Sequence, residues 1–258
     1  MRLSSTQRGS QRTRSWLASY SSSRGGCVSK DFAVPHSAGL GRWLAGRVAD
    51  VWYLCVKTAL WAICKVLFRL RIEGRGHEPA RGPFIVAANH ASAIDPPIVG
   101  MSLKHKAAYM AKHELLRAPV LGALLRSIGV FPVRRGEPDR KAIRRSLEVL
   151  ESGGVLVMFP EGTRSLDGRL RAPEPGAAMI ALRTGAAVMP VAVINSQRIL
   201  PKGARRPKMQ RVTVRMGPLI AVPKIEGRLD HETLEGWGTR IIEAIEKLLP
   251  ADQRRIRQ

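Results

Sequence analysis

The sequence predicts an α/β fold in which a mixed, largely parallel sheet is flanked by helices. Short apolar runs of strand type alternate with segments of helical spacing, and two of these helical segments open at an Asp of capping type. With 258 residues the chain is long enough to build one sizeable core. Hydrophobic residues make up 45% of it and aromatic ones only 5%, so we expect a core of Val, Ile, Leu and Ala.

The predicted elements follow one another along the chain after residue 73. Strands are expected at 84–88, 107–111, 130–133, 155–159, 187–194 and 211–216. Helices are expected at 95–103, 119–127, 139–152, 176–184 and 232–249. Asp95 and Asp139 are interpreted as N-caps, with Pro96 at the first helical position. Pro190 is expected to interrupt its strand, because proline cannot donate to a sheet ladder.

A long apolar segment at residues 43–72 precedes these elements. The run 51–70 is apolar except at Lys57, Thr58, Lys65 and Arg69, and these four share an arc of roughly 120° on a helix with Arg47 and Asp50 upstream. Internal cations argue against a membrane span, so we expect an amphipathic helix at the membrane interface whose cations snorkel toward water. The alternative is an ordinary amphipathic helix buried against the domain.

Residues 1–36 are rich in Ser, Arg and Gly and show no apolar periodicity, which indicates a disordered basic tail. They lack the uninterrupted apolar segment of a secretory signal peptide, and a start site assigned too far upstream would also explain them. The expected organisation is therefore a tail at 1–36, a membrane-interface helical segment at 43–72 and an α/β domain at 73–250.

The charge balance restricts the partners. Lys and Arg number 43 against 20 Asp and Glu, a net charge of +23, which suits anionic lipids, phosphorylated ligands or nucleic acid. A nucleic-acid-binding protein is the rival interpretation, since residues 198–215 carry cations and no acid. No aromatic residue is interleaved there and no nucleic-acid module is recognisable, so we expect an anionic membrane surface and no nucleic acid. Cys27, Cys55 and Cys64 lack metal-ligand spacing and are interpreted as small buried hydrophobes without disulfides.

One short segment, Asn89–Asp95, joins a titratable base to a carboxylate. His90 and Asp95 would point about 140° apart on an uninterrupted helix, so they meet only if His90 lies in the turn before a helix that Asp95 begins. Asp95 would then fix the imidazole tautomer and leave the other ring nitrogen as a base. The plainer alternative is an exposed loop histidine beside a helix cap.

A second polar segment, Phe159–Ser165, follows a strand of buried type. Ligands bind at the carboxyl ends of strands in open α/β sheets. Gly162 allows a tight turn, Arg164 suits bidentate phosphate binding, and Glu161 either orders the loop or contacts polar groups of a ligand. Arg135, the second of two adjacent arginines after another strand, is a further candidate phosphate ligand. A charged surface turn is the alternative.

Together these segments resemble the glycerophospholipid acyltransferase family, most closely the bacterial 1-acyl-sn-glycerol-3-phosphate acyltransferases. Four family blocks occur in order within about residues 45–225, and they are Asn89–Asp95, the block of Arg135, Phe159–Ser165 and Val188–Val191. The resemblance implies that His90, held by Asp95, deprotonates the free hydroxyl of 1-acyl-glycerol-3-phosphate. That oxygen then attacks the thioester of acyl-CoA or acyl carrier protein and gives phosphatidic acid.

The resemblance also assigns the remaining residues. Those expected at the substrate phosphate are Arg135, Glu161, Gly162, Thr163 and Arg164, and those in supporting roles are Asn89, Ser92 and Pro190. It implies no metal and no cofactor beyond the acyl donor. The expected partners are lysophosphatidic acid, membrane lipids and the donor, and the expected location is the cytoplasmic face of the cell membrane, peripheral or monotopic.

The sequence departs from the family pattern near the second polar segment. Pro173 and Glu174 stand where the family commonly has an aromatic–Lys pair, which removes a candidate headgroup cation. Arg134 replaces an acidic or polar residue. Another lyso-lipid or a polyol phosphate therefore remains an alternative substrate for the same mechanism. A membrane-bound scaffold without activity is disfavoured by the retained His90 and Asp95.

Overall fold

The computed structural model describes residues 37–133, 139–165, 167–199 and 208–255. The chain divides into two units, Met1–Ala45 and Gly46–Gln258, and helix α2 (Ser37–Leu67) begins in the first and ends in the second. The sheet and the candidate site belong to the second unit. Residues 1–36 lie outside the described part, as does Cys27.

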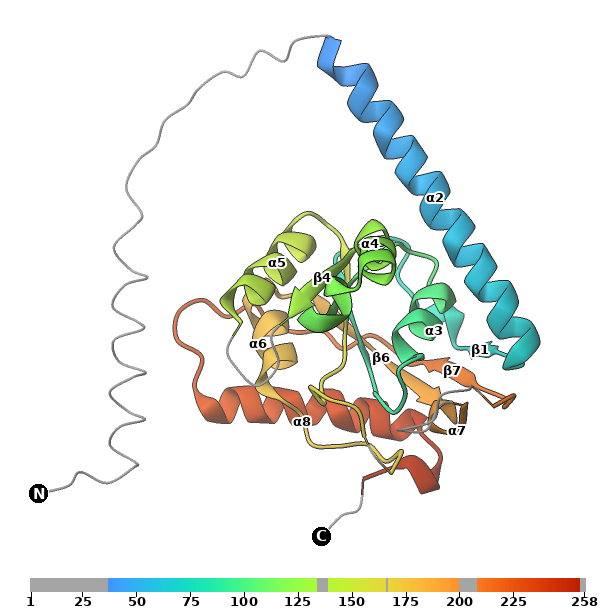
Figure 1. Ribbon diagram of the computed structural model, residues 1–258. Coiled ribbons are helices and arrows are strands. Elements are labelled where there is room, and N and C mark those ends of the chain that lie inside the picture. Colours follow the sequence, from blue (N-terminus) through green and yellow to red (C-terminus); the bar gives the residue numbers. More distant parts are fainter. Residues whose placement is uncertain (1–36, 134–138, 166, 200–207, 256–258) are drawn as a thin grey trace, which may run out of the picture. The chain divides into compact units, whose positions relative to one another are not determined.

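The second unit contains a seven-stranded sheet with the order β1-β7-β6-β2-β5-β3-β4 (Figure 1). Every neighbouring pair is parallel except β6 with β7, so the prediction of a mixed, largely parallel sheet is confirmed. The strands are β1 (Arg71–Glu73), β2 (Phe84–Ala88), β3 (Ala107–Lys112), β4 (Val130–Val133), β5 (Val155–Met158), β6 (Ala187–Ile194) and β7 (Thr213–Met216). Only β1 was not predicted, because its three residues show no apolar alternation and gain their order by pairing with β7.

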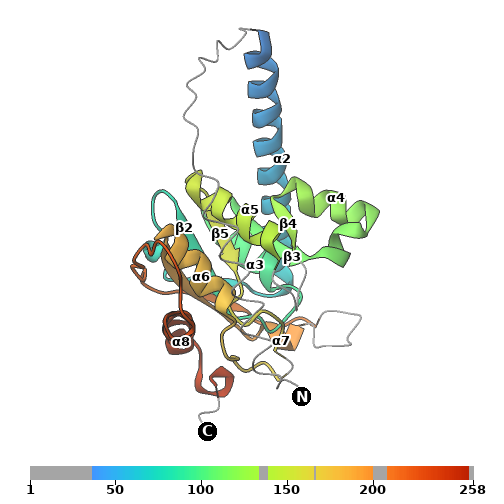
Figure 2. The same cartoon turned by 90° about the vertical axis from the view of Figure 1, so that its left-hand side faces the viewer.

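Helices cover both faces of the sheet, as the burial of alternate residues along β2 shows. Phe84, Val86 and Ala88 pack in the core that contains α3 and the end of α2, whereas Ile85 and Ala87 pack in the core under α5, α6 and α8. Figure 2 shows the same layers from the side. The helices are α3 (Asp95–Ser102), α4 (Pro119–Ser127), α5 (Arg140–Glu151), α6 (Pro175–Thr184), α7 (Ser196–Ile199) and α8 (His231–Leu248), with short 3-10 turns η1 (Arg75–His77), η2 (His113–Arg117) and η3 (Ala251–Gln253).

Two local predictions about strands and caps have opposite outcomes. Asp139 caps α5 as predicted, because its carboxylate accepts the N–H groups of Lys141 and Ala142. Pro190 does not interrupt β6, which is continuous and pairs with β2 on one side. On the other side of β6, the pairing with β7 begins only at Val191, the residue after Pro190. There the Pro190 carbonyl accepts the N–H of Gly217 at 2.8 Å. The missing N–H is therefore not needed by a ladder.

Helix α2 exposes an apolar surface within the second unit. Phe68, which follows it, and Cys64 are buried, Lys57 is half-buried, and Cys55 is exposed, contrary to the expectation that both of these cysteines are buried. The exposed large hydrophobic residues of α2 are Val48, Val51, Trp52, Leu54, Trp61, Ile63, Val66 and Leu67. Lys57 contradicts the predicted outward cation arc, because it turns inward to backbone carbonyls. Among the described helices, none is both long and apolar enough to cross a membrane.

Candidate active site

The candidate site begins where the central strand β2 ends. Asn89 follows β2 directly and is buried, and its side-chain amide makes two hydrogen bonds to the backbone of Val193 in the neighbouring β6. The Asn89 oxygen accepts the Val193 N–H at 2.7 Å, and the Asn89 nitrogen donates to the Val193 carbonyl at 3.1 Å. These bonds fix the start of the turn that carries His90.

His90 and Asp95 meet in the geometry that the spacing required. His90 lies in the turn after β2, Asp95 is the first residue of α3, and His90 Nδ1 lies 3.1 Å from Asp95 Oδ2. Asp95 is not the N-cap, however; Ile94 holds that position. The Asp95 carboxylate turns back toward the preceding turn instead of capping its own helix, because that is where His90 and two backbone N–H donors lie.

The Asp95 carboxylate is fully buried and collects donors on one oxygen. Oδ2 accepts the backbone N–H groups of Ala91 at 2.7 Å and Ser92 at 2.6 Å, besides the imidazole of His90. A carboxylate only accepts, so the hydrogen of the neutral ring resides on Nδ1 and Nε2 carries the lone pair. Within the described part of the chain no hydrogen bond reaches Nε2, which leaves it available as a base.

Glu161 joins the two polar segments of the sequence. Its Oε1 accepts the backbone N–H of His90 at 2.6 Å, and its Oε2 accepts the backbone N–H of Arg171 at 2.9 Å. The N–H of Ser165 donates to the His90 carbonyl at 2.8 Å. Both sides of the His90 peptide are thus held by the segment that follows β5, and the imidazole ring stacks on Phe159 with centroids 4.3 Å apart.

Burial changes the proton affinity of Glu161. The side chain is almost wholly withdrawn from solvent, and this burial raises its pKa to about 7 from an ordinary value of 4.5. The negative charge of Asp95 acts in the same direction, whereas the N–H groups of His90 and Arg171 act in the opposite one. Glu161 therefore titrates near neutral pH.

Of the two roles expected for Glu161, its contacts favour ordering of the loop over phosphate binding. Its carboxylate is buried and committed to two backbone N–H groups, and a carboxylate would repel a phosphate. Gly162, Thr163 and Arg164 follow it and are exposed. Gly162 adopts a left-handed conformation with φ of 67°, which turns the chain outward at this point.

The other predicted residues lie in different places. Arg135 falls in residues 134–138, outside the described part of the chain. Ser92 is buried and donates its backbone N–H to Asp95. Pro190 pairs with Ala87 of β2, and Ala87 lies three residues before His90. Pro190 therefore contacts the strand that leads to the site.

Two contacts of His90 were not foreseen from the sequence. Phe159 was recognised only as part of a family block, although its ring is the surface on which the imidazole stacks. Ser165 contributes through its backbone N–H, which any residue type would supply. An apolar aromatic residue directly before a polar loop was the only available signal. Among the described residues, no group of three or more His, Cys, Asp or Glu side chains is placed to hold a metal ion.

Comparisons with known proteins found similarities over the part of the chain that contains these residues. The model of the Acyltransferase family matches residues 69–194, a range that contains Asn89–Asp95 and Phe159–Ser165. The 1-acyl-sn-glycerol-3-phosphate acyltransferase of Borreliella burgdorferi is 30% identical over 174 residues, which are 66% of this chain and 68% of that protein. The chloroplastic enzyme of the same name from Arabidopsis thaliana is 32% identical over 150 residues. Those residues are 56% of this chain, which spans only 42% of the length of that relative.

Two further similarities bear on fold and substrate. The crystal structure of the 1-acyl-sn-glycerophosphate acyltransferase PlsC from Thermotoga maritima superposes with a TM-score of 0.66 at 26% identity, covering 79% of this chain and 82% of that one. The lyso-ornithine lipid O-acyltransferase of Pseudomonas aeruginosa is 34% identical over 164 residues, 60% of this chain and 62% of that protein. The relatives therefore agree in their transfer of an acyl group and differ in the lipid named as substrate.

Proposed function

The chain belongs to the acyltransferase family, and on this premise we propose that it transfers a fatty acyl group to the free hydroxyl of 1-acyl-glycerol-3-phosphate. The acyl donor is acyl-CoA or acyl carrier protein, and the product is phosphatidic acid. The observation that carries the proposal is the arrangement of His90: Nδ1 is held by Asp95 at 3.1 Å, and Nε2 is left without a protein partner among the described residues.

The chemistry follows from this arrangement. Nε2 of His90 takes the hydroxyl proton while the substrate oxygen forms a bond to the thioester carbonyl carbon. The carbon–sulfur bond then breaks, the thiolate leaves, and the proton on Nε2 passes to it. Buried Asp95 stabilises the imidazolium that exists between these two steps. General base catalysis of this kind contributes about 10²- to 10⁴-fold to the rate.

Phosphate binding is assigned to the exposed residues of the second segment. Arg164 is exposed two residues after Gly162, and its guanidinium suits bidentate phosphate binding. We assign Arg135 the same role on the resemblance alone. Glu161 becomes a positioning residue, since it acts on His90 through the peptide backbone.

The exposed apolar face of α2 supports a location at the membrane surface. Trp52, Trp61 and Ile63 are between 40% and 49% exposed, which is unusual for large apolar side chains of a helix that packs on a domain. Aromatic residues with nearby cations favour the headgroup region of a bilayer. We assign this face to the bilayer in which both the substrate and the product reside, and place the protein peripherally on the cytoplasmic side.

A direct assay tests the function. Purified protein is incubated with labelled acyl-CoA or acyl carrier protein and a panel of lyso-lipids, and the products are identified by mass. Phosphatidic acid formed by the wild type and absent with His90→Ala supports the proposal. Transfer to none of the lyso-lipids, or equal transfer by the His90→Ala variant, contradicts it.

A second candidate differs only in the substrate headgroup. Glu174 occupies the position of the cation expected from the family, and a Cβ atom at residue 162 would lie 2.7 Å from Glu174 Cγ. The Glu174 side chain therefore lies against Gly162. A carboxylate at this place favours a lyso-lipid whose headgroup carries an ammonium group over a simple phosphate, and one relative is named for such a lipid.

A further inference from the structure

Helix α3 carries Asp95 at its first residue, and its other end is held by groups from two different parts of the chain. It has eight residues, which corresponds to a length of about 12 Å. Its residues from Ile98 to Ser102 are buried, so the helix has little freedom to bend between its two ends. A displacement at one end of so short and well-packed a helix moves the other end as well.

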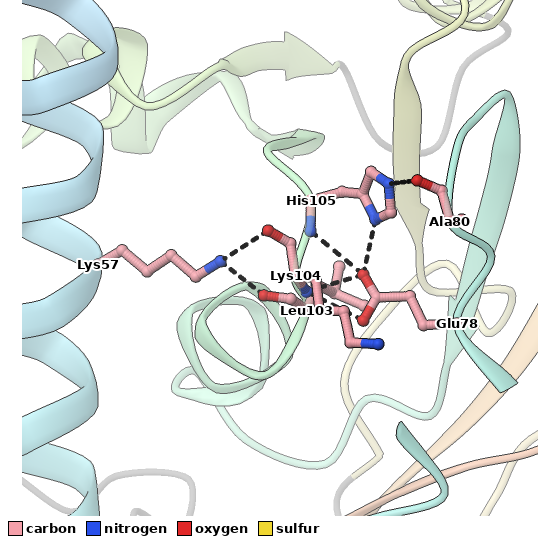
Figure 3. Close-up of polar contacts among 6 residues, drawn as sticks. All are labelled: Lys57, Glu78, Ala80, Leu103, Lys104 and His105. Carbon is pink, nitrogen blue, oxygen red and sulfur yellow. Dashed lines mark hydrogen bonds and ion pairs between the residues drawn. The ribbon is translucent and has the colours of Figure 1, made fainter. Parts of the chain in front are cut away.

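A buried acid fixes the segment that follows α3. Figure 3 shows Glu78 pointing into this segment, with its carboxylate on the backbone N–H of Lys104 at 2.7 and 2.9 Å and on the backbone N–H of His105 at 3.2 Å. Glu78 also accepts His105 Nδ1 at 2.8 Å, while His105 Nε2 lies 3.2 Å from the carbonyl of Ala80.

Lys57 of α2 supplies the second contact. Its ammonium donates to the carbonyl of Leu103 at 2.5 Å and to that of Lys104 at 3.3 Å, at the C-terminal end of α3 (Figure 3). A cation there is favourable because the last carbonyls of a helix are unpaired and carry negative partial charge. Burial lowers the pKa of Lys57, Glu78 opposes this lowering, and Arg75 adds to it.

We propose that Lys57 is a positioning residue for Asp95, which it reaches through α3. Asp95 is the first residue of α3, and Lys57 contacts the carbonyl at the other end of this helix. Lys57 itself belongs to α2, which has an exposed apolar face. Seating α2 on a bilayer therefore also determines where the Asp95 carboxylate lies relative to His90. The expected effect of Lys57 on turnover rests on the proposed function, whereas its expected effect on the position of the Asp95 carboxylate does not.

The position of the Asp95 carboxylate can be measured independently of turnover. The backbone N–H groups of Ala91 and Ser92 donate to Asp95 Oδ2, so their hydrogen exchange rates measure the position of the carboxylate without any turnover. A merely stabilising role of Lys57 would change exchange throughout the domain. A positioning role changes it at these two amides and within α3.

The experiment compares Lys57→Met with Lys106→Met in the full chain. Lys106 is the matched control because it also joins the same loop to α2, through an exposed ion pair with Asp50 at 3.3 Å that contributes little. For Lys57→Met we expect kcat to fall about tenfold or more, with the KM for the lyso-lipid unchanged, because small displacements of catalytic groups reduce rates strongly. Exchange at Ala91 and Ser92 should rise about tenfold in parallel.

Further variants and a vesicle condition distinguish failure of the positioning role from failure of the proposed function. Lys57→Arg keeps a donor for the two carbonyls and should restore kcat and exchange to near wild-type values. Adding phosphatidylglycerol vesicles should slow exchange at Ala91 and Ser92 in the wild type and in Lys106→Met, but not in Lys57→Met. If Lys57→Met does not fold, Lys57→Gln is measured in its place. Wild-type exchange at both amides in folded Lys57→Met or Lys57→Gln overturns the positioning role, whereas absent acyl transfer with the exchange effect intact overturns the proposed function alone.

Discussion

The Glu161 carboxylate accepts the backbone N–H of His90 at 2.6 Å, across 71 positions of the chain. This bond connects the end of β2 to the loop after β5, which are neighbouring strands of the sheet. It places the Glu161 carboxylate behind the turn that carries His90, where its oxygens accept the backbone N–H groups of His90 and Arg171.

Replacing Glu161 with Gln should therefore reduce turnover and not substrate affinity. An amide offers one carbonyl oxygen for the two N–H donors of His90 and Arg171, and its own N–H₂ would face the second of them. We expect kcat to fall about 10²-fold, the cost of a small misplacement of the base. Steady-state kinetics with varied lyso-lipid checks this, and a rise in KM at unchanged kcat would restore the phosphate role.

The raised pKa of Glu161 predicts a pH-dependent stability. Between its ordinary value of 4.5 and its folded value of about 7, the native protein binds a proton that the unfolded chain has released. The free energy of unfolding should therefore decrease as pH rises through this window, by on the order of 3 kcal/mol, and then level off. Urea unfolding at about pH 5 and pH 8 should show this decrease in the wild type and a smaller one in Glu161→Gln. Equal pH dependence in both proteins would contradict the assignment.

Replacing either member of the proposed catalytic pair should abolish most of the activity. His90→Ala removes the base, and Asp95→Asn removes the negative charge that holds the Nδ1 hydrogen and stabilises the imidazolium. We expect a loss on the order of 10²- to 10⁴-fold in kcat for each. Circular dichroism and vesicle binding should remain at wild-type levels for His90→Ala. Substantial residual transfer by that variant would exclude His90 as the base.

Arg164→Ala should weaken binding of the lyso-lipid and leave the acyl donor unaffected. The loss of one bidentate phosphate contact corresponds to about 1.5–3 kcal/mol, or roughly ten- to hundredfold in KM. Lys247→Ala is a suitable control, because it removes an exposed cation on α8. A defect confined to the KM of the donor would contradict the phosphate role.

Glu174→Lys should shift the choice of substrate toward phosphate headgroups. The new cation would stand beside Gly162, where the family pattern places one. We expect kcat/KM for 1-acyl-glycerol-3-phosphate to rise about tenfold relative to a lyso-lipid with an ammonium headgroup, which corresponds to about 1.4 kcal/mol. Competition between the two lipids in one vesicle measures the ratio directly. An unchanged ratio would show that Glu174 does not contact the headgroup.

Polar substitutions on the exposed face of α2 should release the protein from vesicles. Ile63 is 49% exposed and Leu219 is 43% exposed, so Ile63→Ser and Leu219→Ser remove similar apolar areas from different surfaces. Burial of such a side chain in a bilayer contributes about 1.5–3 kcal/mol, so Ile63→Ser should reduce partitioning roughly tenfold or more. Co-sedimentation with anionic vesicles checks this. Equal partitioning of both variants would place the membrane contact elsewhere.

Much of the fold and the identity of the central residues could be predicted from local patterns. Apolar runs located the strands other than β1, because a strand buried on both faces is apolar along its whole length. The spacing of His90 and Asp95 excluded a shared helix and so required the turn that the structure contains. The order of the polar segments was sufficient to indicate an acyltransferase.

Other properties depended on contacts between residues far apart in the chain. The role of Glu161 follows from its burial behind His90, and no local pattern distinguishes a carboxylate that faces a ligand from one that faces the backbone. Lys57 was read from helical periodicity as an outward cation, yet it turns inward because the carbonyls that end α3 offer it partners. Sequence by itself determined which groups are present and in what order, since these depend on neighbouring residues. Tertiary structure decided which atoms each group faces, because burial and hydrogen bonding are set by segments that meet only in the fold.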